Sequence, residues 1–147
     1  MRNLKPILLV EDDDVDAMTV QRAFEDLKIA NPLVHLCDGE EALTYLRDKS
    51  KPAPCVILLD LNMPRMNGIE FLKALKSQEA LRPIPIVVLT TSKAEQDKLE
   101  SFMLGISGYM TKPADYKEFV EKIKMIDLYW TLSELPDGEH EYGRCKI

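Results

Sequence analysis

Four short apolar runs in this chain each end at a residue that can carry chemistry. The runs, with the residues that follow them, are Ile7–Val10 with Glu11 and Asp12, residues 56–59 with Asp60, residues 86–89 with Thr90, and residues 109–111 with Lys112. If these runs are neighbouring parallel strands, their carboxyl ends converge on one cleft, where acids, a hydroxyl and an ammonium meet. Such a cleft favours a divalent cation and a phosphoryl group.

Longer amphipathic segments alternate with the apolar runs, and this alternation is typical of an α/β fold in which helices connect parallel strands. A further strand is predicted over residues 34–37. Helices are predicted over residues 14–28, 40–48, 68–79, 93–104, and from Asp115 onward. The runs 56–59 and 86–89 are apolar on both faces, so they are predicted to be central strands covered by helices on both sides.

Two helices carry more specific expectations. The first, capped by Asp13 or Asp14, should bury an apolar stripe composed of Val15, Met18, Ala23, Phe24 and Leu27. The last should dock on the sheet through Phe119, Ile123, Ile126 and Trp130. Its second stripe is Met125, Leu128, Leu132 and Leu135. That stripe either packs against the C-terminal tail or forms an interface in a homodimer.

Composition excludes several classes of protein. The 147 residues suit one domain, and no apolar stretch approaches the roughly 20 residues of a membrane helix. The N-terminus lacks an export signal, so a cytoplasmic location is expected. The formal net charge is -6 and the basic residues are scattered, which disfavours binding to nucleic acid. Cys37, Cys55 and Cys145 have no spacing that supports a disulfide framework or a zinc site.

The acids after the first and third strands point to a magnesium site. Carboxylates held together repel one another, and Mg²⁺ is often bound by one or two carboxylates plus a phosphoryl oxygen. Glu11, Asp12 and Asp60 fit that description. For the Glu11, Asp12 and Asp13 cluster alone, a solvated acidic turn that caps the first helix is an equally good interpretation.

Asp60 follows four apolar residues directly, so its carboxylate can leave the core and attack phosphorus to give an aspartyl phosphate. The alternative, a helix cap, is disfavoured because residues 61–68 separate it from the next helix. Lys112 can bind a phosphoryl oxygen or pair with Asp60, although a surface lysine is the simpler interpretation of a lone lysine. Pro113 makes the preceding peptide bond a candidate for the cis form. Thr90 can donate a hydrogen bond to a phosphoryl group or serve only as a good strand former.

Four motifs, in order, resemble those of the receiver domain of two-component response regulators. They are residues 7–13 (ILLVEDD), 58–68 (LLDLNMPRMNG), 88–92 (VLTTS) and 108–113 (GYMTKP). The resemblance covers about residues 6–129. It implies a flavodoxin-like (βα)5 doubly wound sheet of order 2-1-3-4-5 with an extended C-terminal helix. The receiver domain is expected over residues 1–135. Residues 136–138 (PDG) break any helix and the residues after them are mostly polar, so a mobile tail is expected over residues 136–147.

The resemblance further implies a role for each site residue. Asp60 would be the phosphoacceptor, and Glu11, Asp12 and the backbone carbonyl of Asn62 would help it to hold Mg²⁺. Thr90 and Lys112 would bind the phosphoryl oxygens. Thr90 and Tyr109 would form the conformational switch. One departure is Glu11, where members of the family often have aspartate. Its extra methylene favours a bridging water over direct coordination.

By the same resemblance, the protein accepts a phosphoryl group from a sensor histidine kinase and is a signalling protein rather than an enzyme. The output is a changed surface around the helix over residues 93–104, the last strand and the last helix, which is also the expected homodimer face. With nothing beyond residue 147, the expectation is a single-domain regulator that signals through protein contacts. A narrower similarity is to stand-alone response regulators paired with cyanobacterial and bacterial phytochromes, which suggests a phytochrome as the kinase.

Three alternatives have weaker support. A phosphatase or phosphotransferase that forms an aspartyl phosphate typically has a second acid two residues after the nucleophile, where this chain has Asn62. A flavin-binding electron carrier needs a phosphate loop after the first strand, but here that loop is acidic. An interaction module that is never phosphorylated should lack the acids and the lysine, all of which are present.

Overall fold

The structure is a computed structural model that describes residues 5–60, 68–81, 83–90, 108–111 and 115–132. For residues 68, 69, 90, 108, 109, 111 and 128–132 it describes the backbone alone. The strands are β1 (Ile7–Val10), β2 (Leu33–Leu36), β3 (Val56–Asp60), β4 (Ile86–Thr90) and β5 (Gly108–Thr111). The helices are α1 (Asp14–Asp26), α2 (Gly39–Arg47), α3 (Gly68–Lys76) and α5 (Tyr116–Leu132).

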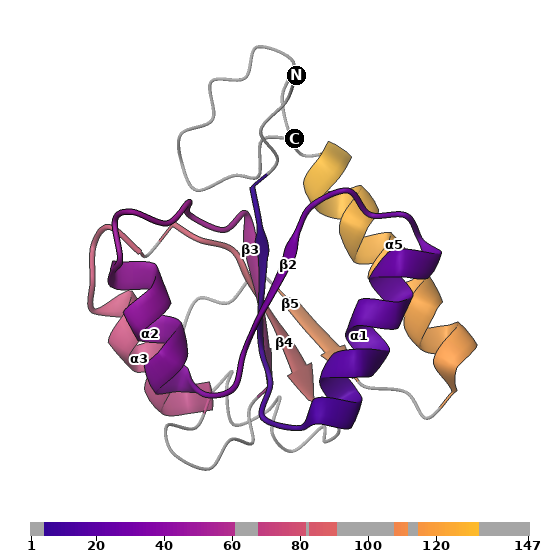
Figure 1. Ribbon diagram of the computed structural model, residues 1–147, viewed down its shortest axis with the longest axis horizontal. Helices are drawn as coiled ribbons and strands as arrows, with labels where there is room; N and C mark the ends of the chain where they lie inside the picture. Colours follow the sequence, from indigo (N-terminus) through magenta and orange to yellow (C-terminus); the bar gives the residue numbers. More distant parts are fainter. Residues whose placement is uncertain (1–4, 61–67, 82, 91–107, 112–114, 133–147) are drawn as a thin grey trace.

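All the described strands belong to one parallel sheet of order β2-β1-β3-β4-β5, as predicted. Helices α1 and α5 cover one face of this sheet, and α2 and α3 cover the other (Figure 1). The helix predicted over residues 93–104 lies outside the described residues. The fold therefore has three layers, and the carboxyl ends of all five strands lie along one edge of the sheet.

The central strands are buried on both faces, as their apolar sequences predict. In β1, Ile7 and Leu9 pack on the side of α1 and α5, while Leu8 and Val10 pack on the side of α2 and α3. All four side chains are 0% exposed. Burial of such a side chain stabilises a fold by about 1.5–3 kcal/mol, so these strands anchor their C-terminal ends firmly.

The predicted apolar stripe of α1 is partly wrong. Val15 and Met18 are 70% and 65% exposed, whereas the buried side chains are Ala17, Val20, Ala23 and Phe24. Each residue advances an α-helix by about 100°, so Val15 lies about 200° from Ala17 and faces away from the sheet. Ala17 is small, and Val15 is the more hydrophobic of the two by sequence alone. The placement of α1 on the sheet decides which face of the helix is buried, so two apolar side chains, Val15 and Met18, remain in solvent.

The remaining elements agree with the prediction apart from their ends. Strand β2 is displaced by one residue, and α3 ends at Lys76 rather than at residue 79. On α5, Phe119 and Ile123 are buried, and Met125 of the second stripe is 68% exposed. The side chains of Leu128, Trp130 and Leu132, together with Leu135 and the tail over residues 136–147, lie outside what the structure describes. Among the described residues, no helix combines the length and apolar character needed to cross a membrane.

Candidate functional site

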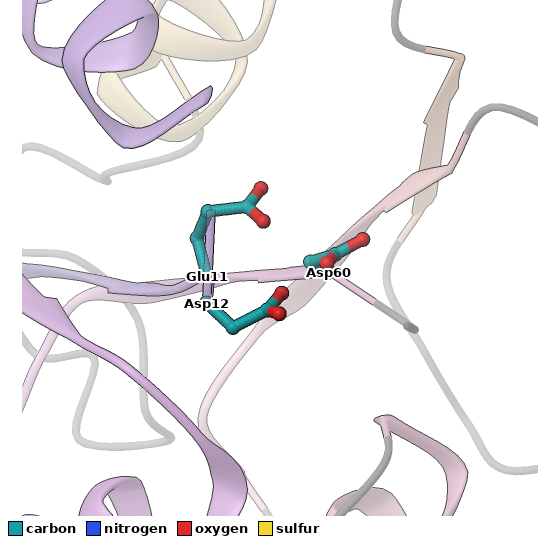
Figure 2. Close-up of side chains that lie close together, drawn as sticks. All are labelled: Glu11, Asp12 and Asp60. Atoms are coloured by element: carbon teal, nitrogen blue, oxygen red, sulfur yellow. The ribbon is translucent and has the colours of Figure 1, made fainter. Parts of the chain in front are cut away.

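The C-terminal ends of β1 and β3 bring three acids together. The two strands pair in parallel, with Val10 opposite Leu59, so the residue after Val10 and the residue after Leu59 reach the same edge of the sheet. These residues are Glu11 and Asp60, and Asp12 follows in the loop to α1. Figure 2 shows the three side chains gathered at this edge. The expectation that acids from two separate strands meet is confirmed.

The oxygens of these carboxylates lie close enough together to surround one cation. One oxygen from each of Glu11, Asp12 and Asp60 lies within 4.8 Å of the other two. Oxygen ligands on opposite sides of Mg²⁺ lie about 4.2 Å apart, since each lies about 2.1 Å from the ion. Glu11 and Asp60 are 1% and 6% exposed, while Asp12 is exposed. A small inward movement or one bridging water suffices for all three acids to bind a hard divalent cation, and they form a candidate metal centre.

The loop between β1 and α1 is held by a relay of hydrogen bonds. The backbone N–H of Asp13 donates to Oε2 of Glu11 at 3.3 Å. The carboxylate of Asp13 in turn caps α1, accepting from the N–H groups of Val15 at 2.8 Å and Asp16 at 3.1 Å. The acids of this turn therefore have different roles: Asp13 is the cap that the simpler interpretation predicted, whereas Glu11 belongs to the cluster of three carboxylates.

A contact between β2 and this loop was not predicted from the sequence. Nε2 of His35, on β2, lies 2.6 Å from the backbone carbonyl oxygen of Glu11. The pairing of His35 with Leu9 makes this contact possible, because it brings the imidazole beside the residues that follow β1. That register is the only signal that could have predicted the contact, and the sequence does not specify it.

The other predicted site residues are described in part or not at all. Asn62, Lys112 and Pro113 lie outside the described residues. For Thr90 and Tyr109 the structure describes the backbone: Thr90 ends β4, and Tyr109 pairs with Val88 on β5. Strand β4 pairs with β3, with Leu89 opposite Asp60, so the backbone of Thr90 lies at the edge that carries the acids.

A second group of acids surrounds the end of β2. The side chain of Glu41 accepts from the backbone N–H of Cys37 at 3.2 Å, and Asp38 caps α2 by accepting from the N–H of Glu41 at 2.9 Å. Desolvation raises the pKa of the Cys37 thiol above its usual value. Smaller contributions in the same direction come from the negative charges of Glu41, Asp14, Asp38 and Asp12. Acidic side chains therefore make the potential negative from the cluster of Glu11, Asp12 and Asp60 to the end of β2. Within the described part of the chain, Cys37 and Cys55 are not joined in a disulfide.

Comparison with known proteins identifies the class. Residues 7–124 match the family model of the response regulator receiver domain. This match covers all the described strands and the first part of α5, including the three acids of the cluster. The chain therefore belongs to the response regulator receiver family and is a signalling protein of the two-component type.

Two named relatives are similar to this chain over most of their length. The chain is 39% identical over 127 residues to the probable methanogenesis regulatory protein FilR2 of Methanothrix harundinacea, a match that covers 84% of this chain and 82% of that protein. It is 38% identical over 130 residues to the response regulator Rcp1 of Synechocystis, with 86% and 88% covered.

Two solved structures are similar over nearly their whole length. The Mn²⁺-bound form of Rcp1 superposes with a TM-score of 0.77 at 37% identity, covering 88% of this chain and 96% of that one. The phosphorylated cyanobacterial phytochrome response regulator RcpA gives 0.77 at 37% identity, covering 90% and 97%. Both the fold and the narrower similarity to phytochrome-associated response regulators are thus confirmed.

Proposed function

We propose that this receiver accepts a phosphoryl group on Asp60 from the phosphohistidine of a sensor kinase. The observation that carries the proposal is the approach of the nearly buried Asp60 carboxylate to Glu11 and Asp12 at the carboxyl edge of the sheet. Neighbouring carboxylates repel an anionic phosphoryl group, so transfer to one of them requires a cation that binds both. Glu11, Asp12 and Asp60 would hold the Mg²⁺ ion, which when bound would supply positive charge to offset that of the phosphoryl group.

The transfer exchanges one bond for another. A carboxylate oxygen of Asp60 forms a bond to phosphorus as the phosphorus–nitrogen bond to the kinase histidine breaks, and the imidazole leaves with the electron pair. A carboxylate that is bound to a divalent cation attacks as the anion, so the transfer to Asp60 would need no general base. Glu11 and Asp12 contribute orientation and charge rather than proton transfer, and water later hydrolyses the acyl phosphate.

The remaining assignments rest on position in the sequence. Asn62 follows Asp60 by two residues, and we assign its backbone carbonyl to the metal. Lys112 follows β5 and supplies an ammonium for a phosphoryl oxygen. Thr90 ends β4 at the same edge as the acids and supplies a hydroxyl. Tyr109 on β5 turns inward when Thr90 moves toward the phosphoryl group.

We further propose that this switch changes a homodimer surface that includes β5 and α5. Phosphorylation replaces the single negative charge of the Asp60 carboxylate with the roughly 1.5–2 negative charges and three strong acceptors of a phosphoryl group, which displaces the residues that bind them. Met125 on α5 is 68% exposed, which leaves this apolar side chain available for contact with a second copy of the chain. Sedimentation of the phosphorylated protein with and without Met125→Glu tests the surface. Phosphorylation-dependent dimers that the substitution removes support it, and unchanged monomers contradict it.

The phytochrome-linked names of the similar structures suggest the donor. RcpA is a phosphorylated phytochrome response regulator, so we propose a phytochrome-type histidine kinase as the partner of this chain. The exposed free thiol of Cys37 suits a reducing compartment, and we place the protein in the cytoplasm.

Labelling by a small phosphodonor tests the central proposal. The protein is incubated with acetyl phosphate and Mg²⁺, and the intact mass is measured. One phosphoryl group is expected on the wild type, none on Asp60→Asn, and one on Asp48→Asn, which removes an exposed carboxylate on the loop after α2. Labelling of Asp60→Asn to the wild-type extent contradicts the assignment. Sustained turnover of a phosphomonoester substrate instead favours the phosphatase alternative.

A further inference from the structure

His35 connects the edge strand β2 to the loop that carries the first two acids. Its side chain is half-buried, and Nε2 lies 2.6 Å from the backbone carbonyl oxygen of Glu11. A carbonyl oxygen can only accept, so Nε2 carries a proton and donates it to this bond. The tautomer of the neutral ring is therefore fixed by its partner.

Both backbone polar groups of Glu11 are tied to β2. The N–H of Glu11 donates to the carbonyl of Leu36 at 3.0 Å, and the carbonyl of Glu11 accepts from His35. These groups belong to the two peptide planes on either side of the Glu11 Cα atom. Holding both planes fixes the direction in which the Glu11 side chain leaves the backbone and the direction in which the chain enters Asp12.

We propose that His35 is a positioning residue for the candidate metal centre formed by Glu11, Asp12 and Asp60. The bond from Nε2 to the Glu11 carbonyl holds the carboxylates of Glu11 and Asp12 at the separation from Asp60 that receives one cation. Glu11 is 1% exposed, so water does not readily take the place of the lost donor. The inference rests on the proposed metal-dependent function, and it adds a residue that does not itself touch the ion.

Three substitutions separate the hydrogen bond from the bulk of the side chain. His35→Gln keeps an N–H donor at nearly the reach of Nε2, whereas His35→Leu keeps comparable volume without a donor. Val34→Ala is the matched control, because Val34 neighbours His35 on β2 but packs on the opposite face of the sheet with the α2 and α3 cluster. Urea unfolding of each variant gives the loss of stability against which its metal affinity is compared.

The readout is the dissociation constant for Mg²⁺ alone, measured by calorimetry on the full chain without a phosphodonor. Loss of an outer partner that orients metal ligands lowers affinity about 10-fold or more, so His35→Leu is expected to bind Mg²⁺ about tenfold more weakly. His35→Gln and Val34→Ala should stay within about twofold of the wild type. In labelling assays His35→Leu should need more Mg²⁺ for half-maximal rate but approach the wild-type rate at saturation.

Several results overturn the inference. These are wild-type affinity in His35→Leu, equal loss in His35→Gln and His35→Leu, or equal loss in Val34→Ala. If His35→Leu does not fold, His35→Asn replaces it, since the shorter amide does not reach the carbonyl. A wild-type protein that binds Mg²⁺ but is never labelled refutes the proposed phosphoryl transfer while leaving the test of His35 intact.

Discussion

The carboxylates of Glu11 and Asp60 have oxygens within 4.8 Å of each other although their residues are only 1% and 6% exposed. They come from paired strands whose burial on both faces keeps the two ends from separating. Like charges in such a position favour any change that neutralises them, whether a proton, a nearby cation or a bound metal. The stability of the fold and the affinity for a divalent ion are therefore linked at this point.

Glu11→Gln should stabilise the metal-free protein and weaken its response to Mg²⁺. Gln retains an oxygen that can accept from the N–H of Asp13 but replaces one of the two buried carboxyl groups with a neutral amide. We expect the free energy of unfolding in EDTA to rise by about 1 kcal/mol. Saturating Mg²⁺ should stabilise the wild type by about 1.4 kcal/mol for each tenfold excess over its dissociation constant. Urea titrations with EDTA and with Mg²⁺ measure both effects, and a variant less stable than the wild type in EDTA contradicts the account.

Asp12→Asn should weaken Mg²⁺ binding with little change in the free energy of unfolding. Asp12 is exposed, so removal of its charge should change the free energy of unfolding by no more than about 0.5 kcal/mol. As a metal ligand it should nevertheless account for at least about tenfold in Mg²⁺ affinity, or about 1.4 kcal/mol. Calorimetry on Asp12→Asn and on Asp16→Asn, a half-buried acid on α1 outside the cluster, makes the comparison. Equal affinities of the two variants would exclude Asp12 from the site.

Asp13→Ala tests the assignment of the helix cap. The Asp13 carboxylate accepts from two N–H groups at the start of α1, and loss of such a cap destabilises a protein by about 1 kcal/mol. Asp13→Ser keeps an acceptor and should recover most of the loss. Both variants should retain Mg²⁺ binding within about twofold, because it is the backbone of Asp13 that contacts Glu11. A large loss of affinity in Asp13→Ser would show that the side chain belongs to the metal site instead.

The thiol of Cys37 reports on the acids around the end of β2. Desolvation and then the charge of Glu41 raise its pKa, so Glu41→Gln should lower the pKa and enlarge the thiolate fraction at a given pH. The residue is exposed, which limits the gain in alkylation rate near pH 8 to about twofold. The pH profile of alkylation, in a background with Cys145→Ser, provides the measurement. Glu118→Gln, on α5, should leave the profile unchanged, and a slower reaction in Glu41→Gln would contradict the electrostatic cause.

The sequence specified the strands and the convergence of the acids because both depend on local patterns. Apolar runs identify buried parallel strands, and the residue after each run must lie at the carboxyl edge. Asp60 was predicted correctly at this edge for that reason. The role of Asp13 as the cap of α1 was also predictable, because capping depends on the residues of a single turn.

Features that depend on the relative placement of two elements were not predictable. Val15 and Met18 were assigned to the core because they are apolar, but the angle at which α1 meets the sheet selects Ala17 and Val20 instead. The contact of His35 with Glu11 depends on the register of β1 with β2, which short apolar strands do not encode in a single sequence.

Chemical trapping of the phosphorylated residue tests the central claim most directly. The protein is labelled with acetyl phosphate and Mg²⁺, and borohydride then reduces the acyl phosphate to an alcohol that survives proteolysis. Peptide mass spectrometry should find the reduced residue at position 60 alone, and only when Mg²⁺ is present. Reduction at Asp12, at Glu11 or at another acid while Asp60 stays intact would contradict the account.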